Sequence, residues 1–289
     1  MYPAPFEYFA PTTMKDALSL LKQHGTSAKL LAGGHSLIPM MKLRLLTPEV
    51  IIDLGRVREL TGIREDRGHL LIGAMTTHQT IESSPAVRSH APLLADVAPC
   101  IGDVQVRNRG TIGGSIAHAD PAADWPAPLL ALEAEFVAAA DGTTRTIRAR
   151  DFFIDMLTTA LKPGEILTEI RVPFQSKDGH AYEKVRQPAS GFALVGIAVQ
   201  LDLDGATCRD ARIGVTGVGS RPVRAERSEA ALKGRSLDER RIREAADHVT
   251  DGLDVLDYLH ASTEFRAELA RVHTRRALQR ASGASGPAK

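Results

Sequence analysis

Two glycine doublets, each followed within two residues by a serine, constrain this chain more than any other feature of its sequence. The first, AGGHS at 32–36, directly follows a short apolar segment, and the second, TIGGS at 111–115, lies in a predicted loop before a helix. Glycine allows backbone conformations that are closed to other residues, and successive N–H groups that face one way bind an anion. The two turns therefore favour a nest for a diphosphate group, with the hydroxyl groups of Ser36 and Ser115 as further donors.

Simple tight turns with a glycine at positive φ are the alternative interpretation of both doublets. Neither turn matches the GxGxxG pattern of Rossmann folds or the GxxxxGK[ST] pattern of P-loops. The sequence therefore argues against those two nucleotide-binding classes, and leaves the diphosphate nest and the plain turn as the open interpretations.

Hydrophobic periodicity and turn residues predict a chain that mixes helices and strands. Thr13, with Asp16 three residues later, is typical of a capped helix, which Gly25 would end. Strands are predicted over 28–31, 50–54, 70–74, 136–140, 144–148, 166–172, 182–186, 192–203 and 208–215. Helices are predicted to start at 76–77 and 84–85, and to cover 93–100, 121–132, 223–232, 238–250 and 264–280. The length of 289 residues suits about two domains, with the polar stretch at 175–179 as the linker.

Charge and cysteine content exclude several classes of function. Lys plus Arg number 36 against 35 Asp plus Glu, so the chain lacks the positive charge that non-specific nucleic-acid binding requires. No apolar run approaches the ~20 residues of a transmembrane helix, and no secretory signal is visible, so we expect a cytoplasmic protein. Two cysteines are too few for an iron–sulfur cluster held by four thiolates, and the histidines show no HExxH spacing. We therefore expect no metal in this chain.

Two long segments around the doublets resemble the flavin-binding signatures of a known family. These are AGGHSLIPMMKLR at 32–44 and RNRGTIGGSIAHADPAADWP at 107–126. Both resemble the FAD-binding medium subunit of molybdenum hydroxylases, a family that includes aerobic carbon monoxide dehydrogenase and xanthine dehydrogenase. The segments FEYFAPTTMKDALSLL, IGAMTTHQTI and YEKVRQPASGFALVGIAVQL are similar to it as well, so the resemblance covers most of the chain.

The resemblance implies a fold and a division of labour. It implies an α+β chain whose residues 1–176 form a two-lobed FAD-binding domain of the vanillyl-alcohol-oxidase/PCMH type, with lobes of about 1–55 and 56–176. Residues 177–289 would form a smaller α/β domain, with a three-stranded antiparallel sheet and C-terminal helices. FAD would take electrons from a small [2Fe–2S] subunit and pass them to NAD, a quinone or another acceptor. A large partner subunit would hold the molybdenum cofactor, in a dimer of heterotrimers.

Cofactor-binding residues follow from the resemblance by position, whereas no catalytic residue is implied. The two glycine turns would wrap the FAD diphosphate, Ile101 would lie against the isoalloxazine ring, and Lys184 would stabilise the negative charge of reduced flavin. The implied FAD contacts are Leu31, Ala32, Gly33, Gly34, His35, Ser36, Leu37, Ile101, Thr111, Gly113, Gly114, Ser115, His118, Asp124, Leu167, Lys184 and Phe192.

Several of these residues also have an ordinary structural interpretation. Asp124 could lie on the solvated face of a helix, and Lys184 could point to solvent. Ile101 and Leu167 could be core residues, as most Ile and Leu are. His118 could be a loop histidine without a ligand.

Two positions depart from the pattern of the family. Ser115 stands where many relatives have Asn, which removes a side-chain hydrogen bond of about 1 kcal/mol. Phe192 stands where carbon monoxide dehydrogenase subunits have Tyr, which puts a carbon monoxide substrate in doubt and leaves FAD binding untouched.

Two other functions remain open at the level of the sequence. One is a self-sufficient flavin-dependent oxidase or reductase, which would need a base over the flavin, and no candidate base is evident. The other is a non-catalytic assembly subunit without a nucleotide, against which the intact glycine turns argue. Yellow protein that releases FAD on denaturation would exclude the assembly subunit, and partner chains that copurify would separate the other two.

Overall fold

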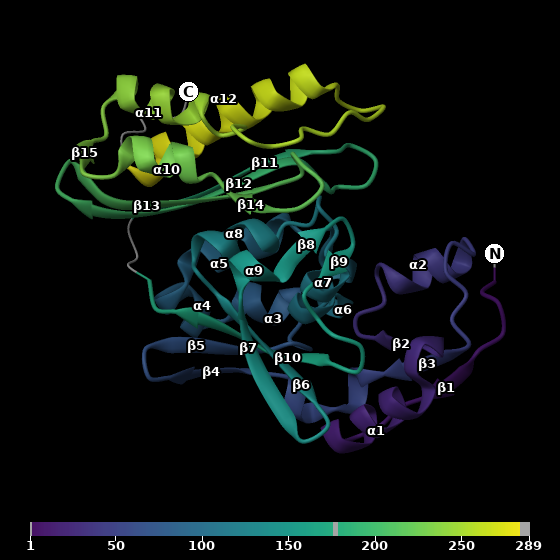
Figure 1. Cartoon of the computed structure of the whole chain (residues 1–289). Coiled ribbons are helices and arrows are strands. Elements are labelled where there is room, and N and C mark those ends of the chain that lie inside the picture. The colour runs from purple at the N-terminus through teal and green to yellow at the C-terminus, as the bar shows by residue number, and fades with distance from the viewer. Residues whose placement is uncertain (1, 176–178, 284–289) are drawn as a thin grey trace.

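Three sheets of three or more strands, each with a hydrophobic core, follow one another along the described chain in the computed structural model (Figure 1). The structure describes residues 2–175 and 179–283. The N-terminal lobe lies beside the middle part of the chain, and the C-terminal part covers the middle part on another side (Figure 1). This mixture of helices and strands confirms the predicted α+β class.

The N-terminal lobe contains a parallel three-stranded sheet with two helices. Its strands are β1 (Glu7–Phe9), β3 (Val50–Asp53) and β2 (Ala28–Leu31), in that order across the sheet. Its α-helices are α1 (Met14–His24) and α2 (Leu37–Lys42), and its short 3-10 helices are Gly25–Ser27, Leu54–Arg56 and Arg58–Leu60. Helix α1 begins as predicted, because the Thr13 hydroxyl accepts a hydrogen bond from the Asp16 backbone N–H at 3.1 Å. It ends at Gly25, where φ is +52°.

The middle part packs a five-stranded antiparallel sheet against a layer of short helices. The strand order is β4 (Ile63–Asp66), β5 (His69–Gly73), β10 (Ile166–Pro173), β6 (Glu135–Ala140) and β7 (Thr143–Arg148). The helices are α3 (His78–Ser83), α4 (Pro85–His90), α5 (Pro92–Val97), α6 (Val104–Arg109), α7 (Ile112–His118), α8 (Pro126–Ala131), α9 (Ala149–Phe152) and the 3-10 helix Ala98–Cys100. A two-stranded ribbon, β8 (Phe153–Asp155) with β9 (Thr158–Thr159), completes this part. Trp125, Phe136 and Phe152 are fully buried in its core.

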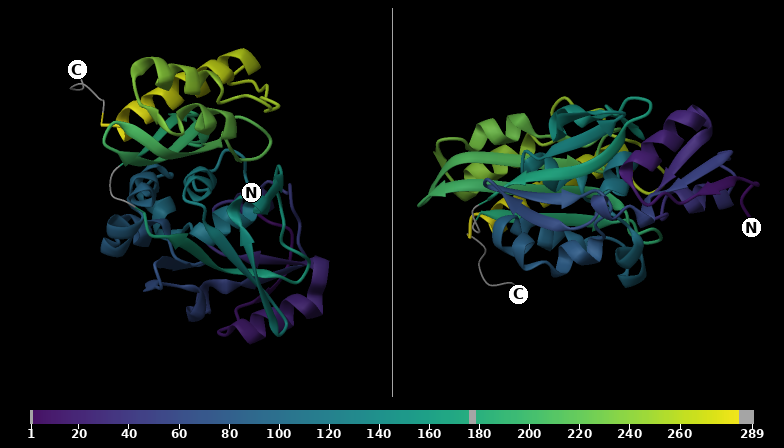
Figure 2. Two further views of the ribbon diagram at one scale, coloured as in Figure 1. Left: turned by 60° about the vertical axis from the view of Figure 1, so that its left-hand side comes forward. Right: turned by 90° about the horizontal axis from the view of Figure 1, so that it is seen from below.

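The C-terminal part is an antiparallel sheet between two layers of helices. Its strands are β11 (His180–Arg186), β12 (Ala193–Asp204), β13 (Thr207–Thr216), β14 (Val223–Arg224) and β15 (Arg235–Ser236). The three long strands are the three that the sequence predicts, and the two-residue strands β14 and β15 are additional. Helices α10 (Glu226–Leu232), α11 (Glu239–Asp247) and α12 (Thr263–Ala281) lie on the outer side of this sheet. Helices α5 and α8 face its inner side, as the left view of Figure 2 shows.

Two of the predicted helices are wrong in part. The segment 223–232 begins as strand β14 before it becomes α10. The helix predicted over 121–132 begins only at Pro126. A helix starting at 121 would need N–H groups at Pro126 and Pro128, and proline has none.

The carbonyl groups before Pro126 also bind elsewhere. The Thr216 hydroxyl donates to the carbonyl oxygens of Pro121 and Ala123 at 2.7 and 2.8 Å, and Ala193 N–H donates to that of Ala122 at 3.1 Å. These bonds join the segment 121–125 to the C-terminal sheet.

The predicted domain boundary between residues 176 and 177 lies outside the described residues. Across the described ranges, no helix combines the length and apolar character that a membrane span requires.

Candidate functional site

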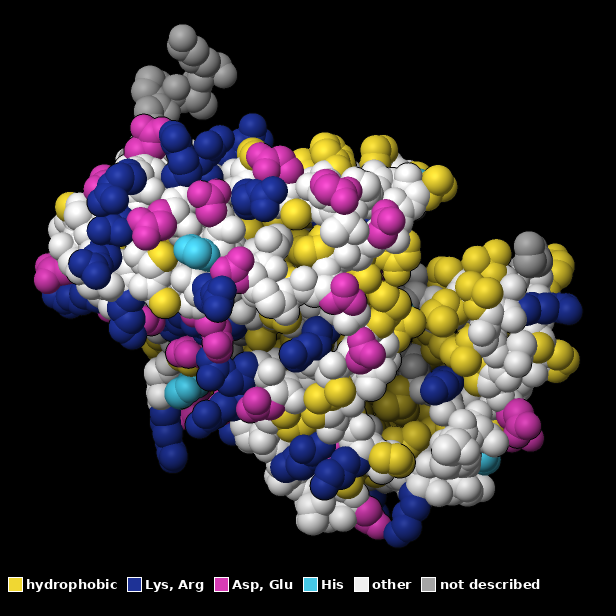
Figure 3. All heavy atoms as spheres, turned by 45° about the horizontal axis from the view of Figure 1, so that its top comes forward, with side chains coloured by type: hydrophobic (Ala, Val, Ile, Leu, Met, Phe, Trp, Pro, Cys, Tyr) yellow, Lys and Arg dark blue, Asp and Glu magenta, His cyan; other side chains and the backbone are white. Residues whose placement is uncertain are grey.

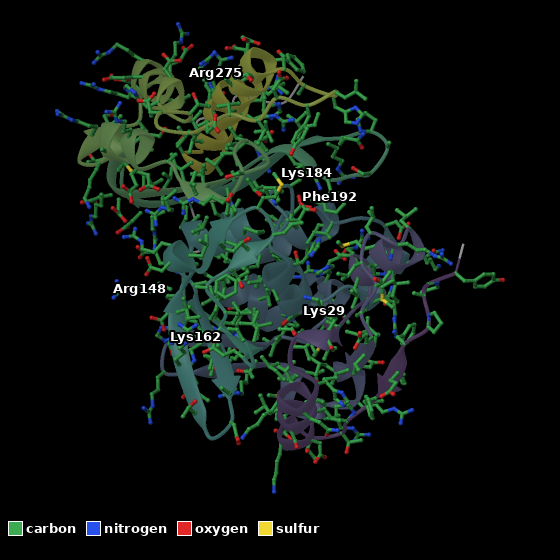
Figure 4. The ribbon with its side chains drawn as sticks, turned by 45° about the vertical axis from the view of Figure 1, so that its right-hand side comes forward. Lys29, Arg148, Lys162, Lys184, Phe192 and Arg275 are labelled. Atoms are coloured by element: carbon green, nitrogen blue, oxygen red, sulfur yellow. The ribbon has the colours of Figure 1, made fainter. Side chains whose placement is uncertain are left out.

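A hollow lined with hydrophobic side chains separates the N-terminal lobe from the C-terminal part (Figure 3). Strand β2 ends on the lobe side of this region, where the first glycine turn leads into α2. Lys184 and Phe192 belong to the hairpin of β11 and β12, on the side that Figure 4 shows turned toward the middle part.

The first glycine turn carries a run of free amide groups. Among the described residues, no acceptor binds the backbone N–H of any of residues 33–37. Gly34 has φ of +78°, in the left-handed region that glycine tolerates. Ser36, at the N-terminus of α2, makes no capping bond with its side chain. Five consecutive N–H groups without an acceptor are what the predicted anion nest requires.

The second glycine doublet is built differently from the prediction. It does not lie in a loop, because Gly113 and Gly114 are in the first turn of α7, which Thr111 caps. Ile112 N–H donates to the Thr76 carbonyl at 3.1 Å and Gly113 N–H to the Ala74 carbonyl at 2.9 Å.

The next two amide groups are also bound. Gly114 N–H donates to the Thr111 hydroxyl oxygen at 3.1 Å, and Ser115 N–H donates to the Thr111 carbonyl at 3.1 Å. The amides of 112–115 are therefore occupied, and this turn offers a ligand the hydroxyl groups of Thr111 and Ser115 instead. A Cβ on Gly113 would lie 2.4 Å from the Cβ of Ala74, so this glycine allows α7 to pack against the end of β5.

The two turns lie against each other. A Cβ placed on Gly33 would lie 2.3 Å from the carbonyl oxygen of Arg109 and 2.6 Å from the Cα of Gly110. A Cβ placed on Gly114 would lie 3.2 Å from the Cβ of Ala32. The backbones of the two turns are thus in close contact at Gly33 and at Gly114.

Asp124, Lys184 and Tyr182 form a buried polar cluster. Lys184 Nζ donates to Asp124 Oδ2 at 2.8 Å and to the Cys100 carbonyl at 3.0 Å, and the Tyr182 hydroxyl donates to Asp124 Oδ1 at 2.6 Å. The Lys184 and Asp124 side chains are 4% and 5% exposed, so neither points to solvent.

Burial dominates the protonation of this cluster. It raises the pKa of Asp124 above its ordinary value, while the Lys184 ammonium and the Tyr182 hydroxyl oppose that rise. Burial and the neighbouring Asp124 raise the pKa of Tyr182 well above its ordinary value. Asp124 therefore joins the Lys184 ammonium and the Tyr182 hydroxyl of β11 to the segment before α8.

The remaining predicted contacts are spread around these turns. Leu31 precedes the first turn and Leu37 begins α2, and both are half-buried. His118 is in the last turn of α7, not in a loop. Phe192 is 42% exposed, whereas Leu167 is 5% exposed within the main core.

Ile101 is half-buried at the start of a loop that Arg107 braces. Arg107 Nη1 donates to the carbonyl oxygens of Ile101 and Gly102, each at 3.3 Å. Its Nε donates to Glu82 Oε2 at 2.8 Å. Arg107 therefore holds this loop in place, a role that sequence reasoning missed.

A second omission is the buried pair of His78 and Trp125. Trp125 Nε1 donates to His78 Nδ1 at 3.0 Å, so a neutral His78 carries its proton on Nε2. A Cβ on Gly110 would lie 2.7 Å from His78 Nε2, so the imidazole packs directly against Gly110. Gly33 of the first turn lies against this same backbone segment, at Arg109 and Gly110. Only the segment IGAMTTHQTI pointed to His78, and only through the resemblance.

Comparison with known proteins identifies the family of the chain. Residues 4–175 match the FAD binding domain in molybdopterin dehydrogenase, and residues 180–281 match the CO dehydrogenase flavoprotein C-terminal domain. The carbon monoxide dehydrogenase medium chain of Hydrogenophaga pseudoflava is 42% identical over 282 residues, covering 97% of this chain and 98% of the relative. The nicotine 6-hydroxylase medium subunit of Paenarthrobacter nicotinovorans is 36% identical, covering 94% and 95%.

Solved structures show the same similarity. Carbon monoxide dehydrogenase from Hydrogenophaga pseudoflava, in a form that lacks the Mo-pyranopterin moiety, superimposes with a TM-score of 0.96 at 43% identity, over 99% of this chain and 100% of the other. Quinoline 2-oxidoreductase from Pseudomonas putida 86 superimposes with a TM-score of 0.93 at 33% identity, over 98% and 99%.

Proposed function

The chain belongs to the family of FAD-binding medium subunits of molybdenum hydroxylases, and from that premise we propose that it relays electrons from an iron–sulfur partner subunit, through FAD, to a separate acceptor. As in its relatives, this makes it a flavoprotein subunit of an oxidoreductase.

One observation supports the proposed FAD site: among the described residues the amides of 33–37 have no acceptor, and their turn packs directly against the second turn. A diphosphate needs several donors, and this turn supplies them without a lysine or arginine. The hydroxyl groups of Ser36, Thr111 and Ser115 extend the donor set. Because the Thr111 oxygen already accepts from Gly114 N–H, its own proton is free to be donated.

FAD supplies reversible two-electron chemistry when bound, and the chain supplies its binding and its electrostatic surroundings. Lys184 would favour the negatively charged, reduced form of the flavin. Asp124 holds the ammonium in place and also cancels part of its field, so we propose a moderate electrostatic effect.

The other redox centres of the relay are proposed to lie on partner subunits. The chain has two cysteines, of which Cys208 is fully buried, so it cannot supply the four thiolates that hold an iron–sulfur cluster. We propose a small [2Fe–2S] subunit and a large molybdenum subunit as partners, in a dimer of heterotrimers.

The proposed FAD site is tested by Gly33→Ala. The new methyl group would meet the Arg109 backbone and push the two turns apart, and we expect the dissociation constant for FAD to rise at least tenfold. Gly219→Ala is the matched control, because its Cβ would meet nothing closer than 3.4 Å. Equal FAD affinity in both variants, with circular dichroism unchanged, would show that the diphosphate binds elsewhere.

To test the relay, the iron–sulfur subunit that copurifies with this chain is separated, reduced with dithionite and freed of excess reductant. It is then mixed with the FAD-loaded chain. We expect the visible flavin absorbance to bleach only when that subunit is present. Flavin that stays oxidised in the assembled complex would contradict the relay.

A further inference from the structure

A cavity of about 440 Å³ opens between the loop 187–192 and the loop 256–260, apart from the glycine turns. Its size is within the usual range for small-molecule sites. Apolar side chains make up most of its wall: Met156, Leu157, Phe192, Leu194, Leu256 and Leu259. Phe192 is the one predicted flavin contact among them, so the cavity begins where the predicted flavin site ends.

Arg266, on α12, is the single cation of this wall and is 3% exposed. Its Nε donates to the Leu256 carbonyl at 3.1 Å, and its Nη1 donates to the carbonyls of Leu194 and Gly217 at 2.7 and 2.6 Å. Within residues 2–175 and 179–283, its Nη2 donates to no acceptor, and its guanidinium carbon lies 5.9 Å from the centroid of the Tyr258 ring. Among the described residues, the enclosed side-chain atoms without a hydrogen-bond partner do not include Nη2 of Arg266, so this nitrogen is open to the cavity and offers it a hydrogen-bond donor.

The other polar groups of the wall restrict the ligand. Gln187 Oε1 accepts from the Ser190 hydroxyl at 2.8 Å, and Gln187 Nε2 lies 3.3 Å from His260 Nε2, so these groups largely satisfy one another. Asp120 adds a carboxylate to the same wall. One spare guanidinium NH2 group, on a wall that also carries a carboxylate, is a poor site for a diphosphate, and therefore for a nicotinamide dinucleotide.

We propose that this cavity binds an uncharged, largely apolar ring with a carbonyl oxygen, of the quinone class, and that Nη2 of Arg266 donates to that oxygen. The apolar walls would cover the ring, and a neutral carbonyl would satisfy the donor without adding charge beside Asp120. Arg266 is then the residue that determines ligand specificity.

The role of this ligand as electron acceptor rests on the proposed function. The quinone takes up two electrons and two protons and leaves as a hydroquinone. The negatively charged, reduced FAD would supply both electrons and one proton and return to its oxidised state, and solvent water would supply the second proton. Phe192 lines both the cavity and the predicted flavin position, so the two rings would be neighbours.

Binding is tested with the FAD-loaded chain and the probe 2-methyl-1,4-naphthoquinone, by isothermal titration. We expect one saturable site in the wild type, and a dissociation constant at least tenfold higher in Arg266→Met. Because that variant loses three carbonyl partners and can fail to fold, Met156→Trp is the second variant. It fills the cavity from the β8–β9 turn without touching the carbonyl network.

Ile154→Trp is the matched control, since Ile154 is 52% exposed on the same ribbon and is not part of the cavity wall. Weakened probe binding in Met156→Trp and not in Ile154→Trp would support the proposal. Absence of saturable binding in the wild type, equal binding in both tryptophan variants, or displacement of the probe by NAD would overturn it.

A second readout separates this proposal from the function on which it rests. The FAD content of each variant is measured alongside, and Met156→Trp is expected to keep it. Loss of FAD from the wild type with probe binding kept would contradict the proposed function alone. Normal FAD content without probe binding would contradict the cavity proposal alone.

Discussion

The burial of His78 predicts that the folded chain loses stability as the pH falls. His78 is 4% exposed, and burial lowers its pKa from 6.5 to about 4, helped by the positive charges of His35 and Arg107. In the unfolded chain the same imidazole has its ordinary pKa. Between pH 6.5 and about 4 the unfolded state therefore binds a proton that the native state does not. Stability must fall as the pH falls through this window.

The size of the effect follows from the shift. At pH 5 the protonation of His78 favours the unfolded chain by about 2 kcal/mol, and at pH 4 by about 3 kcal/mol, at 1.36 kcal/mol for each unit of pKa. Other groups titrate over the same range, so the measured quantity is a difference between two chains. His78→Gln removes the titration, and its amide oxygen can still accept from Trp125 Nε1.

Urea unfolding of both chains, followed by circular dichroism and by the emission of the single tryptophan, gives this difference. We expect the stability of the wild type relative to His78→Gln to decrease by about 2 kcal/mol from pH 7.5 to pH 5. A difference that stays constant with pH would refute the reasoning. So would an imidazole pKa near 6 for His78 in an NMR titration of the folded chain.

Three further predictions concern the packing and the ligand donors. Lys184→Met should cost about 3–5 kcal/mol in urea unfolding, because it leaves Asp124 buried without its cation, and adding Asp124→Asn should recover much of that loss. A single variant as stable as the wild type would contradict the buried pair. Gly214→Ala should lower the melting temperature strongly, because its Cβ would lie 1.9 Å from the Ala127 carbonyl oxygen and force α8 away from β13. An unchanged melting temperature would contradict this packing. Ser115→Asn should tighten FAD binding by about 1 kcal/mol, measured by fluorescence titration, whereas unchanged affinity would show that this side chain does not reach the cofactor.

Local signals in the sequence predicted those parts of the fold that are determined locally. Thr13, Thr77 and Ser84 each cap a helix as expected, because a capping bond joins atoms only three residues apart. The Asp141-Gly142 turn joins the predicted strands 136–140 and 144–148 into a hairpin, and Asp204-Gly205 joins the predicted strands 192–203 and 208–215, because such turns are also determined locally.

The parts that failed depend on contacts between distant segments. The stretch before Pro126 is not helical because its carbonyls bind Thr216 and Ala193, more than sixty residues away. Asp124 is buried because Tyr182 and Lys184 reach it from β11. No spacing within 121–126 carries that information, so a solvated helical face remained a sound alternative for Asp124 until the tertiary structure was known.

The two glycine doublets are similar in sequence but differ in which of their backbone amides are already hydrogen-bonded. Both contain two glycines and a serine, and the resemblance treats them alike. Gly34 keeps the amides of its turn free by taking a left-handed conformation, whereas Gly113 brings α7 so close to Ala74 that the amides there are bound within the fold. A diphosphate that touches both turns must then meet backbone N–H groups on one side and hydroxyl groups on the other. Ser115 should therefore contribute more to diphosphate binding than a side chain of the first turn, because the second turn can donate only through its side chains.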